Sequence, residues 1–430
     1  MCGFIATSQQ VDLNSILDHL HYRGLPGYKG YSKIGKYQFG HYSLPFVNLD
    51  KDAAIQPRAD SNVMFVGEIF NYASFGFKDD IECAIRSAVP QTLGDQNRHQ
   101  FDGFWSVIGI MDGDIFAAAD YLSQKPIYYR TDMEAFASEI DVLKLLGPVT
   151  RDQTFRSNTL KWGYSPDPRT PWNEIKQIPP GHIWYKKKLV NYWNWSEVKT
   201  TNLYDDLVTA VENRLSGQRD VAVLVSGGLD SAIIYSVIKN VLGRDVTAIH
   251  VENKEEEYAK LVCDDLVKVT LDNVTDIEAI IVHQTPVDLG SVKPQIAMAK
   301  KLRELGFYAV MTGDGADELF GGYRRAKEYD SQHSDVFCEL PYYHLPRLDR
   351  TMMRYTIETR SPFLSAPVVK HALDTPYEQR IDKKILKETF GHLVPEAILT
   401  RDKHPLKTET IRTDPMVQRK INDEIFQHME

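Results

Sequence analysis

Short strand-like stretches of hydrophobic residues, separated by polar turn residues, dominate the first half of the chain. They are rich in β-branched and aromatic residues and are bounded by Gly, Asp and Asn, which is typical of strands. Helical periodicity is rare in this half, and residues 79–88 carry its clearest example. The clearest strands are predicted at residues 3–7, 62–66, 106–111 and 115–119. We therefore expect an α+β domain built on antiparallel sheets.

The pattern changes between residues 180 and 203. Beyond this stretch, strand-like apolar runs alternate with segments whose apolar residues have helical spacing. Strands are predicted at 221–225, 246–251 and 307–311, and helices at 232–242, 255–266 and 296–305. This alternation predicts an α/β domain with a parallel sheet covered by helices. We place the boundary so that residues 1–195 form the first domain and residues 196–430 the second.

Composition narrows the class of protein. The 430 residues carry a formal net charge of −9, which disfavours a chain-wide surface for nucleic acid. No apolar run approaches the roughly 18 residues that a membrane helix needs, and the N-terminus lacks the pattern of a signal peptide. The four cysteines are widely spaced, so they indicate neither a disulfide framework nor a zinc site. We expect a cytoplasmic protein that binds neither nucleic acid nor membranes.

The sequence SGGLDS at residues 226–231 follows a buried-type strand and opens a helix. Gly227 and Gly228 let the backbone approach a ligand, and the free N–H groups at the helix start form an anion site to which Ser226 and Ser231 add hydroxyls. Asp230 suits a phosphate site only if Mg²⁺ lies between them. The lysine of the Walker loop is missing, and the sequence matches the SGGxDS loop of enzymes that split ATP into AMP and pyrophosphate. An ordinary glycine-rich turn is the alternative.

A second acidic loop, TGDGADE at residues 312–318, follows the strand predicted at 307–311. Loops after the strands of a parallel sheet line one crevice. Asp317 would therefore meet Asp230 across a metal-bound pyrophosphate. A solvated acidic turn is the alternative for this loop on its own.

Cys2 directly follows the initiator Met. A small second residue favours removal of Met, which would leave the cysteine with a free α-amine. That amine can act as the base that activates the thiol of the same residue. The alternative is a chance cysteine at the end of the chain.

These motifs occur in the order found in glutamine-dependent asparagine synthetases, which the chain resembles over nearly its whole length. The motifs are MCGF, YRG, GEIFNY, PPGH, SGGLDSA, TGDGADELFGGY, IETRSPFL, KKILKE and RDK. The resemblance implies an N-terminal nucleophile amidohydrolase-like domain that hydrolyses glutamine at Cys2. It also implies an ATP-pyrophosphatase-like domain that activates aspartate as β-aspartyl-AMP, which ammonia attacks after passing through an internal tunnel. The implied small molecules are glutamine or ammonia, aspartate, ATP and Mg²⁺, and a homodimer is compatible because relatives are often dimers.

The resemblance also implies roles for individual residues of the second domain. Asp230 and Asp317 would hold Mg²⁺ and pyrophosphate. Asp314 would lie near the adenylate and the attacking amine, and Lys403 would offset the charge developing on the phosphate. The stretch with Arg350, Glu358 and Arg360 would lie near the acid substrate, although ion pairing explains Glu358 and Arg360 equally well. The residues implied to line the ATP site are Leu224, Ser226, Gly227, Gly228, Asp230, Ser231, Val251, Thr312 and Gly313.

The glutamine site matches the family only in part. Gly67 would offer a backbone N–H to the oxyanion, Glu68 belongs to the same motif, and Asp80 would pair with the α-ammonium of glutamine. Val66, however, stands where the family has an asparagine that donates to the oxyanion, and loss of one such donor typically costs about 10²–10³ in rate. Ser43 stands where the family has an arginine that grips the glutamine carboxylate. Either glutamine binds differently or the glutaminase is weak.

Three functions follow from this mixture. The first is asparagine synthesis from aspartate and ATP, with glutamine or ammonium as the nitrogen source. The second is an amide or macrolactam synthetase that acts on another carboxylate and has a non-functional glutaminase domain; consumption of ammonia distinguishes the first from the second. The third is a non-catalytic nucleotide-binding protein, which exchange between ATP and pyrophosphate would exclude.

Overall fold

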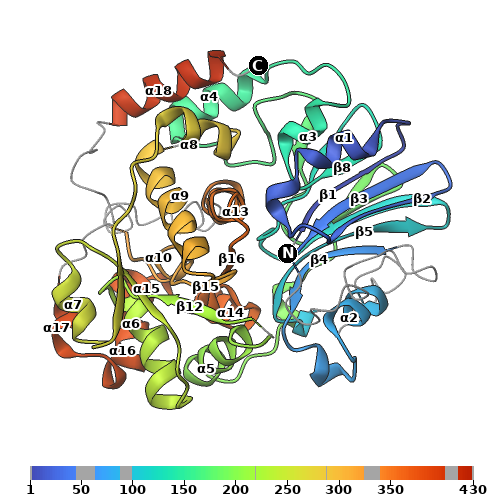
Figure 1. Cartoon of the computed structure of the whole chain (residues 1–430). Coiled ribbons are helices and arrows are strands. Elements are labelled where there is room, and N and C mark those ends of the chain that lie inside the picture. The colour runs from blue at the N-terminus through green and yellow to red at the C-terminus, as the bar shows by residue number, and fades with distance from the viewer. Residues whose placement is uncertain are drawn as a thin grey trace.

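The computed structural model describes residues 2–44, 63–87, 99–217, 219–286, 288–323, 339–401 and 415–428. The first half contains two antiparallel sheets (Figure 1). One has the strand order β2-β3-β1-β8-β7-β9 and the other β11-β10-β6-β5-β4. Their bounds are β1 Cys2–Thr7, β2 Lys29–Ile34, β3 Tyr37–Ser43, β4 Val63–Ile69, β5 Gly103–Met111, β6 Asp114–Ala119, β7 Tyr128–Arg130, β8 Ala135–Ala137, β9 Ile175–Gln177, β10 His182–Tyr185 and β11 Lys188–Asn191. The helices of this half are α1 Leu13–Asp18, α2 Asp80–Ser87, α3 Ile140–Lys144 and α4 Gln153–Trp162.

The two sheets face each other across an apolar core. Phe4 and Phe39 enter it from one sheet, and Met64, Val66 and Ile108 enter it from the other. Each of these residues alternates along its strand with a residue on the opposite face, because successive side chains of a strand point to opposite sides. The packing fixes β1 and β4 relative to each other, and these are the strands that carry Cys2 and Gly67.

The second half is built on a parallel sheet with the order β14-β13-β12-β15-β16. All four strand pairs in it are parallel. Its strands are β12 Val221–Leu224, β13 Ala248–Val251, β14 Leu266–Val269, β15 Ala309–Met311 and β16 Glu358–Arg360. The helices are α5 Leu203–Arg214, α6 Leu229–Ser236, α7 Glu256–Lys260, α8 Asp276–His283, α9 Leu289–Glu304, α10 Ala316–Leu319, α13 Leu345–Met353, α14 Ala366–Asp374, α15 Tyr377–Arg380, α16 Lys384–Phe390, α17 Glu396–Thr400 and α18 Pro415–His428. Two π-helical turns, η7 Val237–Val241 and η8 Leu340–His344, continue α6 and precede α13.

These sheets confirm the predicted fold class, an α+β half followed by an α/β half. The helix predicted at 255–266 is wrong in its second part, because α7 ends at Lys260 and Leu266 begins β14. Asp264 and Asp265 lie exposed between them, and aspartate favours turns over helix interiors. The apolar residues that follow pair with β13, so tertiary pairing decides the structure of this segment.

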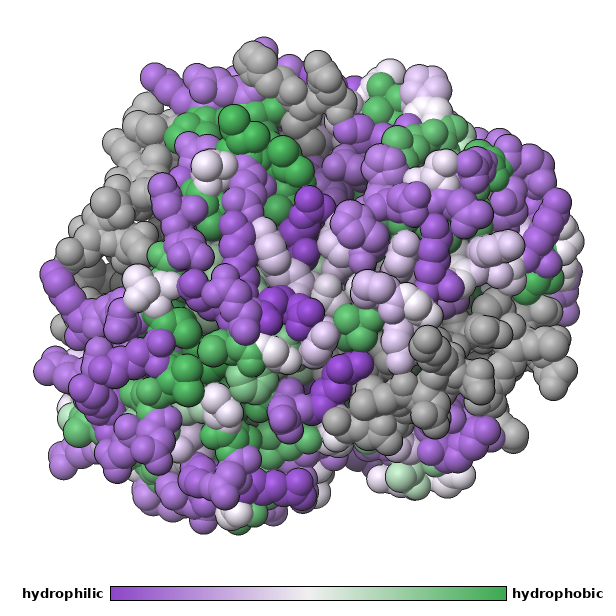
Figure 2. Space-filling model, viewed as in Figure 1, coloured by the Kyte–Doolittle hydropathy of each residue, from purple (hydrophilic) through white to green (hydrophobic). Residues whose placement is uncertain are grey.

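One continuous core joins the two halves. It extends from Phe65 and Trp105 of the first half to Val223, Phe363 and Phe390 of the second. An interface of this apolar kind holds two domains in a fixed relation. Polar side chains cover most of the face drawn in Figure 2, and apolar ones show through mainly on the left of the view. In the ranges that the structure describes, we find no helix with the length and hydrophobicity to cross a membrane.

Candidate functional site

The residues implied for the ATP site gather at one edge of the parallel sheet. Leu224 is the last residue of β12, Val251 is the last residue of β13, and Thr312 directly follows β15. These strands are neighbours, since β12 pairs with both β13 and β15. Their carboxyl ends therefore open into one crevice, which is where nucleotides bind in sheets of this type.

The 226–231 loop is held by its own hydroxyl groups. The Ser231 hydroxyl accepts from the backbone N–H of Ser226 at 3.1 Å and donates to the carbonyl of Gly228 at 3.1 Å. Gly227 has φ +80°, and a Cβ there would lie 2.8 Å from the carbonyl oxygen of Glu255. A side chain at residue 227 would therefore be strained and crowded. The loop is a preformed turn at the start of α6, whose N–H groups favour an anion.

The two acidic loops touch each other. A Cβ on Gly313 would lie 2.8 Å from the Cβ of Asp230, so glycine permits this approach. Asp230 and Asp317 both bind the side chain of Lys383. Its Nζ lies 2.5 and 2.7 Å from the two carboxylate oxygens of Asp230 and 2.5 Å from one oxygen of Asp317. The two carboxylates therefore meet at one buried ammonium group, and the metal-bound pyrophosphate expected between them stays a prediction.

Lys383 belongs to this candidate site, and the sequence motifs did not single it out. It lies in the KKILKE motif, to which no role was given. Only 7% of its side chain is exposed, against 19% for Asp230 and 21% for Asp317. Two carboxylates that face each other away from water require a cation, and this requirement could have directed attention to a lysine in a neighbouring motif.

Asp230 and Asp317 fit a magnesium ion. Mg²⁺ in nucleotide sites is usually bound by one or two carboxylates together with phosphates and water. Both carboxylates lie within 2.5 Å of one Nζ atom, so a single cation can bridge them. Among the residues with described positions, no group of three or more His, Cys, Asp and Glu side chains is arranged to hold a metal. The other ligands would therefore be phosphate oxygens and water.

Asp314 belongs to the same loop as Asp317, and the charges of Glu318, Arg347 and His344 act on it. Burial raises the pKa of Asp314 and the hydroxyl of Thr312 lowers it, with a net increase. Thr312 is itself anchored, since its hydroxyl lies 2.9 Å from that of Ser361. A carboxylate with a raised pKa is a better proton acceptor near neutral pH.

Lys403 lies outside the described residues, so its role stays a prediction. Arg401, two positions earlier, donates from Nη1 to the carbonyl of Gly227 at 3.0 Å and pairs with Glu255. The RDK motif thus begins in contact with the loop that precedes α6.

The residues expected around glutamine lie near the first residue of β1. Cys2 is paired with Ser43 across β1 and β3. Gly67 has φ +124°, and a Cβ there would lie 2.0 Å from the carbonyl oxygen of Phe104, so only glycine fits. Asp80 begins α2, and burial together with the neighbouring Asp79 raises its pKa to about 7. The glutamine-binding roles of Gly67, Glu68 and Asp80 stay predictions.

Both departures from the family's glutamine site are buried. Val66 is 2% exposed and belongs to the apolar core between the two sheets. Ser43 is also 2% exposed, and its hydroxyl has no hydrogen-bond partner among the residues described. An apolar group and a short hydroxyl thus replace the amide and the guanidinium that the family pattern would supply.

Glu68, Glu358 and Arg360 form one buried group across the domain interface. Arg360 lies 2.7 Å from Glu68 and 2.8 Å from Glu358, and it donates to the carbonyls of Arg214 and Ser216 at 2.9 and 2.7 Å. The guanidinium of Arg360 is fully buried. These contacts favour the ion-pair role of Glu358 and Arg360 over a role in binding the acid substrate.

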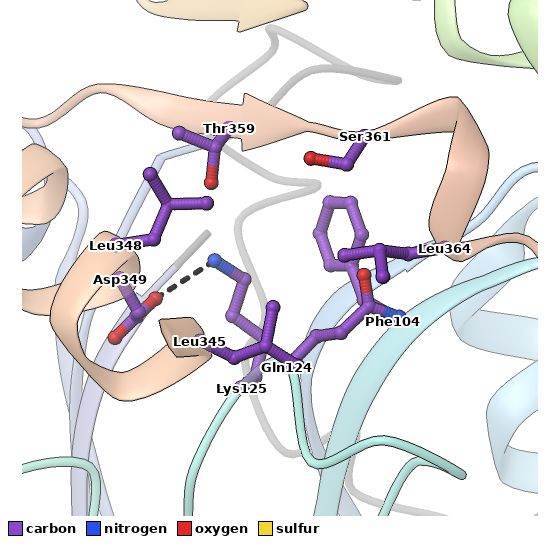
Figure 3. A pocket seen from close by; sticks show the side chains of 9 residues that line it. All are labelled: Phe104, Gln124, Lys125, Leu345, Leu348, Asp349, Thr359, Ser361 and Leu364. Atoms are coloured by element: carbon purple, nitrogen blue, oxygen red, sulfur yellow. Dashed lines mark hydrogen bonds and ion pairs between the residues drawn. The ribbon is translucent and has the colours of Figure 1, made fainter. Parts of the chain in front are cut away.

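A small cavity is lined by residues of both halves of the chain (Figure 3). The volume open to water in it is ≈ 10 Å³, which is about one water molecule. Lys125 projects into it from the first domain and binds Asp349 of α13 at 2.8 Å, and Arg23 binds the same carboxylate at 2.6 Å. The cavity is lined by Phe104, Gln124, Lys125, Leu345, Leu348, Asp349, Thr359, Ser361 and Leu364.

Comparison with known proteins places both halves of the chain. A family model described as asparagine synthase matches residues 202–341 and 330–428, and one described as a glutamine amidotransferase domain matches residues 1–195. A probable glutamine-hydrolyzing asparagine synthetase of Acanthamoeba polyphaga mimivirus is 26% identical, with 99% of this chain and 89% of that protein covered. Glutamine-hydrolyzing asparagine synthetase 3 of Arabidopsis thaliana is 25% identical, with 94% and 78% covered. An asparagine synthetase of the same type from Sandersonia aurantiaca is 24% identical, with 94% and 86% covered.

Proposed function

Because the chain belongs to the asparagine synthase family, we propose that it makes asparagine from aspartate and ATP by way of β-aspartyl-AMP. ATP-dependent amide synthesis is the chemistry of this family, whose members are carbon–nitrogen ligases. The observation that carries the proposal is the convergence of Asp230 and Asp317 on Lys383 at the carboxyl edge of the sheet. The first domain, residues 1–195, would supply ammonia from glutamine, and the second, residues 196–430, would use that ammonia or free ammonium.

The second domain has a group for each requirement of the reaction. The backbone of the 226–231 loop would bind phosphate oxygens, and Asp230 and Asp317 would hold Mg²⁺, which neutralises charge on pyrophosphate when bound. Lys383 keeps the two carboxylates together. Asp314 would accept a proton from ammonia as it attacks the activated carboxyl carbon, and Lys403 would offset negative charge on the phosphate.

The nitrogen source depends on the first domain. Cys2 would be the nucleophile, Gly67 would offer its N–H to the oxyanion, and Asp80 would pair with the glutamine ammonium. Val66 and Ser43 weaken this site, so we propose that ammonium supports a higher rate than glutamine. Soluble small molecules are then the only substrates required, in keeping with a cytoplasmic enzyme.

The direct test uses purified protein with aspartate, ATP and Mg²⁺, and with either glutamine or ammonium. Asparagine, AMP and pyrophosphate are quantified. We expect product with both donors in the wild type and with ammonium alone in Cys2→Ala, while Cys263→Ala serves as a matched control because that thiol is buried. If the wild type makes asparagine from ammonium but not from glutamine, the first domain does not act as a glutaminase. The lack of asparagine with either donor would contradict the proposal and favour a synthetase that acts on another carboxylate.

A further inference from the structure

A polar cluster lies beside Asp314, on elements to which no substrate role has been given. Glu318 of α10 accepts from the hydroxyl of Tyr323 and lies 3.4 Å from Nε2 of His344. Nε2 of His344 lies 3.1 Å from Glu339, and its Nδ1 lies 3.1 Å from Nη2 of Arg347. The cluster thus leads from the loop of Asp314 to Arg347 of α13.

Arg347 is half-buried, and it differs in its partners from the buried arginines. Its contacts are neutral: Nη1 donates to the hydroxyl of Ser291 at 3.1 Å, Nη2 meets the ring of His344, and the guanidinium lies 5.0 Å from the centre of the Tyr343 ring. In the part of the chain that the structure describes, no carboxylate lies at ion-pair distance from Arg347, and its Nε has no hydrogen-bond partner. Arg23, Arg214 and Arg360 each bind a carboxylate at 3.0 Å or less.

The environment of Arg347 is that of a site for an anion. The Nε of Arg347 is buried without a hydrogen-bond partner, and a carboxylate is the partner that a guanidinium binds in two-pronged geometry. Burial lowers the pKa of Arg347, and the nearby groups raise it by more, with Tyr343 and Tyr323 ahead of the carboxylates Asp314 and Glu318. A zwitterion fits this arrangement, because its carboxylate can bind the guanidinium and its ammonium group can bind the carboxylates beside it.

The arginines first expected near the acid substrate are otherwise engaged. Arg350 donates to the carbonyl of His283 at 2.7 Å and to the hydroxyl of Tyr128 at 2.5 Å. Arg360 binds Glu68 and Glu358. Arg347, three positions before Arg350 on the same helix, keeps donor capacity for a ligand.

We propose that Arg347 binds the α-carboxylate of aspartate, and so determines which acid the second domain activates. The side-chain carboxylate would then point toward Asp314 and the nucleotide loops, while the α-ammonium lies on the side of Glu318. The inference rests on the proposed function, because it assigns a residue to the recognition of the substrate proposed there.

The test compares Arg347→Gln with Arg354→Gln, a control from the end of the same helix whose guanidinium stacks on Tyr22. Pyrophosphate release is measured with saturating ammonium while aspartate and ATP are varied in turn. For Arg347→Gln we expect kcat/KM for aspartate to fall by about 100-fold, as the loss of one partner of a buried charge pair does, with an unchanged KM for ATP. The control should behave as the wild type.

A second measurement separates recognition from structural support. 3-Aminopropanoate is aspartate without its α-carboxylate, so its inhibition constant should be the same for the wild type and Arg347→Gln. If the substitution weakens the binding of aspartate, ATP and 3-aminopropanoate equally, the role of Arg347 is structural and the inference is overturned. An unchanged KM for aspartate overturns it as well. If Arg347→Gln does not fold, Arg347→Lys replaces it. Lysine keeps the charge but lacks the planar guanidinium, so kcat/KM for aspartate should fall by about 10-fold. A smaller decrease overturns the inference. A wild-type protein that releases no pyrophosphate with aspartate would refute the proposed function itself, and the inference with it.

Discussion

Substitution of Lys383 by alanine tests the centre of the nucleotide site. The change removes the only ammonium group that binds both Asp230 and Asp317 in the described part of the chain, at distances of 2.5–2.7 Å. Two carboxylates about 4 Å apart in a partly buried site repel each other by about 4 kcal/mol at an effective dielectric constant near 20. About one fifth of each carboxylate is exposed to solvent, which weakens the repulsion. We therefore expect Lys383→Ala to lower the free energy of unfolding by about 2 kcal/mol, half of the value above.

The assay is thermal unfolding of Lys383→Ala with and without Mg²⁺. The loss should lower Tm by a few degrees without the metal, and saturating Mg²⁺ should restore much of it, because the ion can take the place of the ammonium group. The kcat/KM for ATP should fall by about 10²–10³, the usual result of removing one preorganised charge from an active site. Lys384→Ala is the matched control, since the neighbouring lysine is 59% exposed and pairs only at 3.9 Å with Glu388. Equal values of Tm and kcat/KM for the two variants would refute the reasoning.

Three further predictions concern the rest of the molecule. Burial raises the pKa of Asp80 from 3.8 to about 7 in the folded protein, so the folded state loses stability relative to the unfolded state as the pH rises between these two values. Asp80→Asn removes this carboxyl group, and thermal unfolding from pH 5 to 8 should show it to be more stable than the wild type by up to a few kcal/mol. Asp349→Asn removes the carboxylate that binds Arg23 and Lys125, and should cost about 3–5 kcal/mol in denaturant unfolding. Phe426→Ala should cost about 3 kcal/mol and increase proteolysis near the C-terminus, because the buried ring stacks on α4.

Each of these predictions has a control of the same chemical type. Asp18→Asn removes a carboxylate that is 69% exposed and should show no change between pH 5 and 8. Asp141→Asn removes a carboxylate that is 49% exposed, and Ile277→Ala shortens a side chain that is 71% exposed. Changes in stability above about 0.5 kcal/mol in these controls would show that burial is not the deciding factor.

The nucleotide loops could be predicted because their information is local. Residues 226–231 carry their glycines, hydroxyls and carboxylate within six positions, and the strand before them fixes where they lie. The position of Asp317 beside Asp230 followed from the rule that parallel strands end at one edge of a sheet. In both cases a short sequence pattern together with one rule of topology was sufficient.

Contacts between distant segments could not be predicted in the same way. Lys383 is 153 positions from Asp230, and only the turn at residues 381–383 brings it to the sheet edge. The pairing of Glu68 with Arg360 depends on how the two domains pack, so the sequence left ion pairing and substrate binding as equal alternatives for Arg360. The strand β14 was missed because pairing with β13 defines it, whereas the helical spacing of residues 255–266 reaches only its first residue, Leu266.

The last helix, α18, has a consequence for how the protein is made. It lies against α4 of the first domain (Figure 1), where Arg156 binds Asp423 at 2.5 Å across 267 positions of sequence. A chain is synthesised from its N-terminus, so the surface around Phe155 has no cover until the segment that forms α18 has left the ribosome. Synthesis that stops early would release a product with this apolar surface open to aggregation. Docking of α18 on α4 thus requires synthesis of the whole segment between them.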